Sequence, residues 1–151
     1  MSAEDMSATT PLETVATQPR LVPAIFAGAG AALIGAVIWA VVTVTTKYQI
    51  GFMAIGVGYI VGYAVRTIGR GSAVQFGIAG AVLALVGCVL GNVLSTCGFI
   101  SIQESVGNWE VLGRLNPAMI VDLIVSTFDG MDLLFYGIAV YEGYKLSLYR
   151  G

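Results

Sequence analysis

Residues 48–70 read YQIGFMAIGVGYIVGYAVRTIGR, and this stretch decides how the rest of the chain is interpreted. As a helix it places five residues on one face, each four positions after the last: Ala54, Gly58, Gly62, Arg66 and Arg70. A G-x-x-x-G pair such as Gly58 and Gly62 is typical of membrane helices whose backbones approach closely. We therefore expect this helix to form the centre of a bundle, with both arginines at one end.

The composition indicates that the solvent of this chain is lipid. Apolar residues make up 57% of its 151 residues, charged residues make up 11%, and the mean hydropathy is +0.86. A soluble domain has about 25% charged residues, and at this length it buries only about two thirds of its unfolded surface. The net charge of −2 gives no indication of a nucleic-acid partner.

Long apolar runs predict an all-α fold, a bundle of four transmembrane helices. The predicted spans are residues 21–46, 49–69, 72–96 and 129–148. They form one domain, residues 21–151. Residues 1–20 lack apolar periodicity and a basic signal-peptide start, so we expect a flexible tail or a segment that becomes ordered on a partner.

Small residues also recur in the first and third spans. The predicted helix-packing positions there are Ala27, Ala31, Gly35, Gly80, Ala84, Gly87 and Gly91. These faces of small residues can all pack against one another within one chain, or can leave one face for self-association or for a larger partner.

Local signals predict how the first two spans end. Gly69 and Gly71 are expected to break the second helix, because glycine adopts the left-handed conformation without strain. Trp39 is expected near the membrane–water interface. The hydroxyl of Thr43 can return to its own helix backbone, as threonines in apolar helices do.

The one sizeable polar connection precedes the last span. Residues 104–115 are mixed in polarity and suit a short interfacial helix with Trp109 at the depth of the lipid headgroups. Asn116 followed by Pro117 predicts a helix start. The helix over residues 117–128 is too short to cross a bilayer, so we expect an interfacial or re-entrant element.

The distribution of cations predicts the orientation in a cell membrane. With four spans, five of the seven cations lie on the side of both termini: Arg20, Arg66, Arg70, Lys145 and Arg150. Positive charge in short loops marks the cytoplasmic face, so both termini are expected there.

Three polar side chains are candidates for function within the membrane. Glu142 in the last span either pairs with Lys145, three residues on, or handles ions or protons. Asn92 is expected to form an interhelical hydrogen bond, with ligand contact as the alternative. Asp122 could converge with Asp129 and Asp132 to attract cations, whereas helix capping and solvation are the favoured explanation of the three acids.

Three further residues are candidate contacts for a lipid or a protein partner. Arg66 and Arg70 are either cytoplasmic anchors or a site for an anionic lipid headgroup or a partner's carboxylate. Trp109 is the interfacial candidate on the opposite side.

No sequence motif for catalysis is present. The chain has no histidine and no nucleotide-binding loop, and its two cysteines, Cys88 and Cys97, are too far apart to pair within one straight helix. We expect no catalytic residue, no cofactor and no metal site.

Two stretches resemble small bacterial multi-span membrane proteins. They are GFMAIGVGYIVGYAVR at residues 51–66 and FDGMDLLFYGIAVYEGYKLS at residues 128–147. The resemblance implies a bacterial inner membrane and brings no activity or functional residue with it.

Three classes of function are consistent with the sequence. The first is a non-enzymatic structural or accessory subunit of a membrane assembly. The second is an oligomeric channel or a transporter of ions or small solutes, and the third is a membrane enzyme. We favour the first, because no site stands out. The enzyme is the least expected, because histidine is absent and no clustered acid and base is found at membrane depth.

Overall fold

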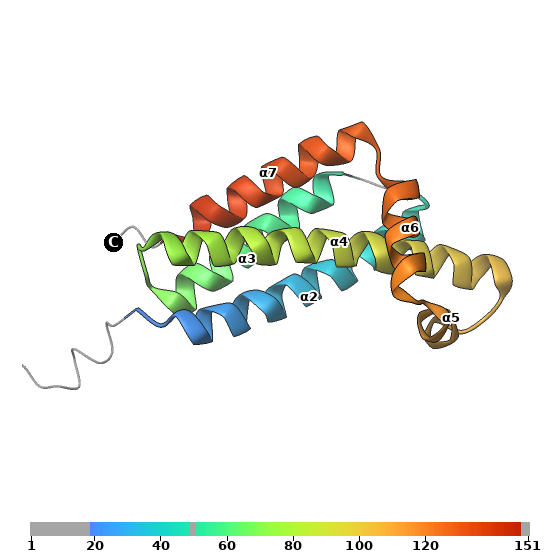
Figure 1. Ribbon diagram of the computed structural model, residues 1–151, viewed down its shortest axis with the longest axis horizontal. Helices are drawn as coiled ribbons and strands as arrows, with labels where there is room; N and C mark the ends of the chain where they lie inside the picture. The colour runs from blue at the N-terminus through green and yellow to red at the C-terminus, as the bar shows by residue number, and fades with distance from the viewer. Residues whose placement is uncertain (1–18, 49–50, 149–151) are drawn as a thin grey trace, which may run out of the picture.

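The computed structural model describes residues 19–48 and 51–148, which form six helices and no strand (Figure 1). The helices are α2 (Leu21–Thr46), α3 (Phe52–Gly69), α4 (Val74–Glu104), α5 (Asn108–Arg114), α6 (Pro117–Thr127) and α7 (Gly130–Ser147). The all-α prediction is confirmed. The tail predicted over residues 1–20 lies outside the described residues, apart from Pro19 and Arg20.

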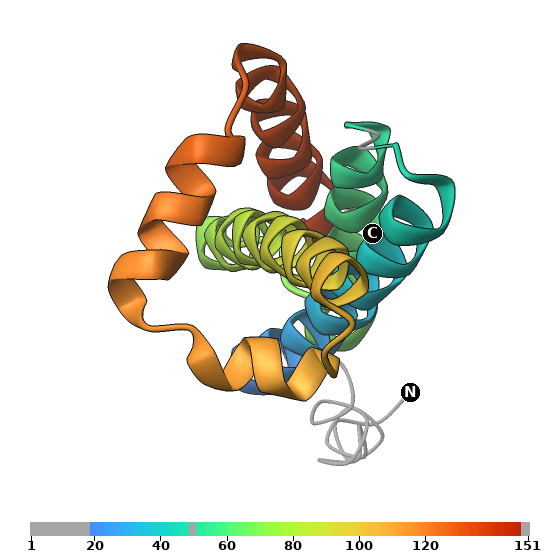
Figure 2. The same cartoon turned by 90° about the vertical axis from the view of Figure 1, so that its right-hand side faces the viewer.

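Helices α2, α3, α4 and α7 pack lengthwise into one bundle (Figures 1 and 2). Helix α4 contacts α2, α3, α5, α6 and α7, whereas α3 contacts only α2, α4 and α7. Helices α3 and α4 thus share the centre of the bundle, because each contacts the other three bundle helices, and α4 alone also contacts α5 and α6. The glycines of α4 face several neighbours, with Gly80 against α7 and Gly87 against both α2 and α3.

Three helices are long and apolar enough to cross a membrane, namely α2, α3 and α4. Helix α7 is as long as α3, with 18 residues. It carries Asp132, Glu142 and Lys145, however, and is not apolar enough to count as a span of the same kind. The predicted count of four spans is thus not confirmed, although α7 packs alongside α3 and α4 as a fourth member of the bundle.

Helix α4 is longer than the predicted third span. It continues eight residues beyond residue 96 and ends at Glu104, so the connection to α5 is shorter than expected. The extension packs on α2, because a Cβ atom added at Gly98 would lie 2.6 Å from Val44 Cγ2. No proline interrupts residues 97–104, so the helix continues where such a neighbour supports it.

Three helices end at non-glycine residues in the left-handed conformation. Lys47, Arg70 and Ser105 have φ angles of 57°, 49° and 56°, and no described glycine has a positive φ. The prediction that glycine ends α3 by its conformational freedom is therefore wrong. Gly71 serves a different purpose, because the ring of Phe76 occupies the space that its Cβ would need.

Helices α5 and α6 form an arm around one end of α4, and α4 is the only helix they contact (Figure 2). The predicted start of α6 is confirmed, since Asn116 Oδ1 accepts a hydrogen bond of 2.9 Å from the Met119 amide. Asp129 and Asp132 form a capping box at the start of α7. These acids are thus held as caps.

Candidate functional site

Glycines close the interior of the bundle by backbone contact. A Cβ atom added at Gly58 would lie 2.5 Å from the Ala139 carbonyl oxygen, and one at Gly62 would lie 2.7 Å from Leu146 Cβ. On the other side of α7, Gly80 of α4 faces Gly143. Helix α7 is therefore held between α3 and α4 with no room for a wider passage at these contacts.

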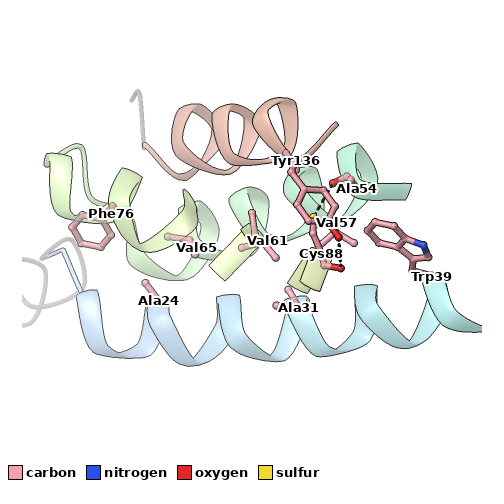
Figure 3. Packing of buried hydrophobic residues seen from close by; sticks show 13 residues of the cluster. Ala24, Ala31, Trp39, Ala54, Val57, Val61, Val65, Phe76, Cys88 and Tyr136 are labelled. Atoms are coloured by element: carbon pink, nitrogen blue, oxygen red, sulfur yellow. Dashed lines mark hydrogen bonds between the residues drawn. The ribbon is translucent and has the colours of Figure 1, made fainter. Parts of the chain in front are cut away.

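The packing face of α2 is rotated from the predicted stripe. Of the three predicted packing positions, Ala31 and Gly35 are buried, but Ala27 is only half-buried. Buried residues instead occupy two adjoining lines, because α3 covers one side of α2 and α4 covers another. The predicted positions in α3 and α4, Ala54 and Ala84 included, lie in the core (Figure 3).

Trp39 occupies the core and not the membrane interface. Its side chain is 1% exposed, its ring packs on Gly91 of α4, and it meets Tyr136 edge-on with ring centroids 6.4 Å apart (Figure 3). The interfacial prediction for Trp39 is therefore wrong. Because Gly91 has no side chain, it leaves the space that the indole ring fills. The contact between the two residues could not be read from the sequence.

A group of buried polar side chains lies in the part of the bundle around Trp39. The group consists of Trp39, Thr43, Cys88, Asn92, Ser95 and Tyr136, contributed by α2, α4 and α7. Asn92 is 4% exposed, and the Tyr136 hydroxyl donates to the Cys88 carbonyl oxygen at 3.4 Å. The Tyr136 bond thus links α7 to α4, and the interhelical hydrogen bond expected of Asn92 stays a prediction.

Two polar atoms of this group have no hydrogen-bond partner among the described residues. They are Trp39 Nε1 and Thr43 Oγ1, one turn apart on α2. Thr45, Thr46, Thr67 and Thr96 each donate to a backbone carbonyl of their own helix. The backbone bond expected of Thr43 is not formed.

Glu142 is half-buried near the end of α7. The predicted ion pair between Glu142 and Lys145 is not formed. Lys145 Nζ instead lies 5.4 Å from the centroid of the Tyr141 ring. On α5, Arg114 and Glu110 form an ion pair at 2.9 Å.

The charged residues separate toward the two ends of the bundle, because the helix ends that carry them gather there. One end has the start of α2 and the ends of α3 and α7, with Arg20, half-buried Arg66, exposed Arg70 and Lys145. The other end has the arm, where Asp122 is exposed on α6 and Trp109 is 87% exposed on α5. This separation comes from folding, since these residues lie far apart in the chain.

The outer face of α3 carries a pair of tyrosines that the stripe of small residues did not reveal. Tyr59 and Tyr63 are each 56% exposed, and their rings stack with centroids 6.4 Å apart. Neither hydroxyl finds a hydrogen-bond partner among the described residues. Their spacing of four residues in an apolar helix was the available signal.

Across residues 19–48 and 51–148, no group of three or more His, Cys, Asp or Glu side chains could hold a metal ion. Comparison of the chain with protein-family models, with curated proteins and with solved structures found no match.

Proposed function

We propose that this protein is a non-enzymatic accessory subunit of a membrane assembly, in which α7 crosses the membrane beside α2, α3 and α4. The outer face of α3, defined by Tyr59, Tyr63 and Arg70, docks against an apolar helix of a larger partner.

The tyrosine pair is the observation that supports this proposal most directly. Tyr59 is the eighth of the 18 residues of α3, so a helix that crosses the bilayer carries it near the midplane. A phenol hydroxyl exposed to hydrocarbon without a hydrogen bond costs about 1–3 kcal/mol. A partner helix with a polar side chain removes this cost, and exposed tyrosines are common anchors of protein interfaces.

The same face of α3 leads to a basic end. Arg70 follows Tyr63 by two helical turns and is exposed, and Arg66 lies between them, half-buried. A partner helix with a polar side chain near the midplane and a carboxylate about two or three turns further on, at headgroup depth, would complement this face. The docking surface therefore has an aromatic centre and a cationic end.

Site-specific crosslinking in native membranes tests the proposal. Benzoylphenylalanine in place of Tyr59 is expected to crosslink to one protein in a fixed ratio. The matched control replaces Phe26, which is 74% exposed on α2. The double substitution Tyr59→Leu and Tyr63→Leu should lower recovery of that partner at least tenfold, whereas Phe26→Leu should not. Equal crosslinking from both positions, or from neither, would overturn the proposal.

A channel or transporter is the main competing function. The backbone contacts of Gly58 and Gly80 against α7 leave no wide passage there, which favours a structural role. The purified chain reconstituted alone in vesicles should therefore give no ion flux. Flux that Glu142→Gln abolishes would replace the accessory function by a transport function.

A further inference from the structure

Helices α2 and α4 form a groove on the side of the bundle away from α7. The two helices run parallel and touch where Gly87 meets Ala32 and where Gly91 meets Trp39. Toward the C-terminal ends of both helices they touch again where Gly98 meets Val44, and a groove of about 400 Å³ lies along this part of their contact. Leu112 of α5 contributes to its wall, so the arm borders the groove at this end of the bundle.

The wall of the groove offers hydrocarbon and no free hydrogen-bond donor from its hydroxyls. Most of the wall is aliphatic, with Val37, Val41, Leu94 and Ile102 among its residues. Its two hydroxyls are engaged within the protein, because Thr45 donates to the Val41 carbonyl and Ser101 donates to the Val106 carbonyl. A polar solute would lose its hydration without replacement here, whereas a hydrocarbon chain would not.

The end of the groove carries the residues of a headgroup layer. Lys47 follows the wall residue Thr45 by two positions, is exposed, and makes no ion pair with any described residue. On α5, Trp109 is largely exposed, while Arg114 is already paired with Glu110. Lys47 is therefore the cation at this end that is available for an anion, at the depth where phosphate groups lie.

We propose that this groove binds one phospholipid of the surrounding leaflet, with an acyl chain between α2 and α4 and its phosphate held by Lys47 Nζ. The bound lipid fills the groove along the contact of α2 and α4 and secures the arm, since the same chain contacts Leu112. This site is separate from the α3 face, so either proposal can fail without the other.

Native mass spectrometry of the full chain tests the lipid site. The protein is delipidated in mild detergent and titrated with dioleoyl phosphatidylglycerol. The first lipid molecule to bind is expected to bind more tightly than any further molecule. Ala40→Phe places a ring in the groove and should weaken this binding about tenfold. Ile34→Phe, on an exposed part of the same helix outside the groove, is the matched control and should leave binding unchanged.

The lysine is tested separately, because Ala40→Phe could disturb folding. Lys47→Gln alters an exposed side chain and should weaken binding about fivefold, and Lys47→Arg should restore it. Unchanged affinity in Lys47→Gln, or equal affinity in Ala40→Phe and the original protein, would overturn the proposal. A dimer that Ala40→Phe dissociates would also overturn it, because a second copy would then occupy the groove.

Discussion

Thr43 is the residue whose surroundings depart most from expectation. Thr45, Thr46, Thr67 and Thr96 return their hydroxyls to the backbone, but Thr43 Oγ1 is buried without a partner among the described residues. An unsatisfied buried hydroxyl costs about 1–3 kcal/mol. Trp39 Nε1, one turn earlier on α2, shares this condition, so two polar atoms of the core are held in place by packing alone.

The substitution Thr43→Val tests this assignment through the sign of its effect. Valine keeps the shape of threonine and removes the unpaired hydroxyl, so the free energy of unfolding should rise by about 1–3 kcal/mol. Thr96→Val is the control, because the Thr96 hydroxyl donates to the Asn92 carbonyl and its loss should not stabilise the protein. Unfolding in mixed detergent micelles measures both. A loss of stability in Thr43→Val would show that its hydroxyl is satisfied.

At the scale of elements, glycine determines how closely α3 approaches α7. Gly58 and Gly62 face the backbone and first side-chain atoms of α7, whereas Gly56, on the same helix, has no heavy atom within 4 Å of an added Cβ. The two kinds of glycine look alike in sequence. Only the neighbour separates a packing position from an open one.

The pair of substitutions Gly58→Ala and Gly56→Ala should change stability in opposite directions. Gly58→Ala places a methyl group against the Ala139 backbone, which cannot move aside cheaply, and should destabilise by about 1–3 kcal/mol. Gly56→Ala gains helix propensity in open space and should stabilise by about 0.5–1 kcal/mol. Detergent unfolding followed by circular dichroism compares them. Equal effects would mean that α3 and α7 are not in contact at Gly58.

Helix starts that depend on neighbouring residues could be read from the sequence. Asn116 and Pro117 are sufficient to start α6, because a cap acts on amides only two or three residues away. The end of α4 could not be read in this way. Its last turns rest against Val44, a residue of another helix.

At the scale of the whole molecule, the bundle has one basic end and one largely acidic end. Arg20 is joined to the end of α3 by a 2.9 Å hydrogen bond from its amide to the Gly69 carbonyl, which brings two cationic segments together. Lys145 lies at the same end, and the other end has the arm, with Glu110 and Asp122, and the start of α7, with its cap Asp129.

This charge separation predicts that the basic end faces the cytoplasm. A reporter fused after Gly151 that is active only in the cytoplasm should therefore be active, and a reporter active only outside should be inactive. A fusion truncated after Glu104 should give the opposite pattern, because α4 ends at the other face. An inactive cytoplasmic reporter after Gly151 would show that α7 does not cross or that the orientation is reversed.

The sequence alone determined the solvent, the helical class and most helix boundaries, since hydropathy, caps and chain length act locally. The tertiary structure decided what each helix face meets: α4 shares the centre with α3, Trp39 is in the core, and the tyrosines of α3 remain outside. In an apolar helix nearly every face is compatible with lipid, so hydrophobicity cannot choose which face packs. Close contact between small residues on different helices makes that choice, and it exists only once the helices are assembled.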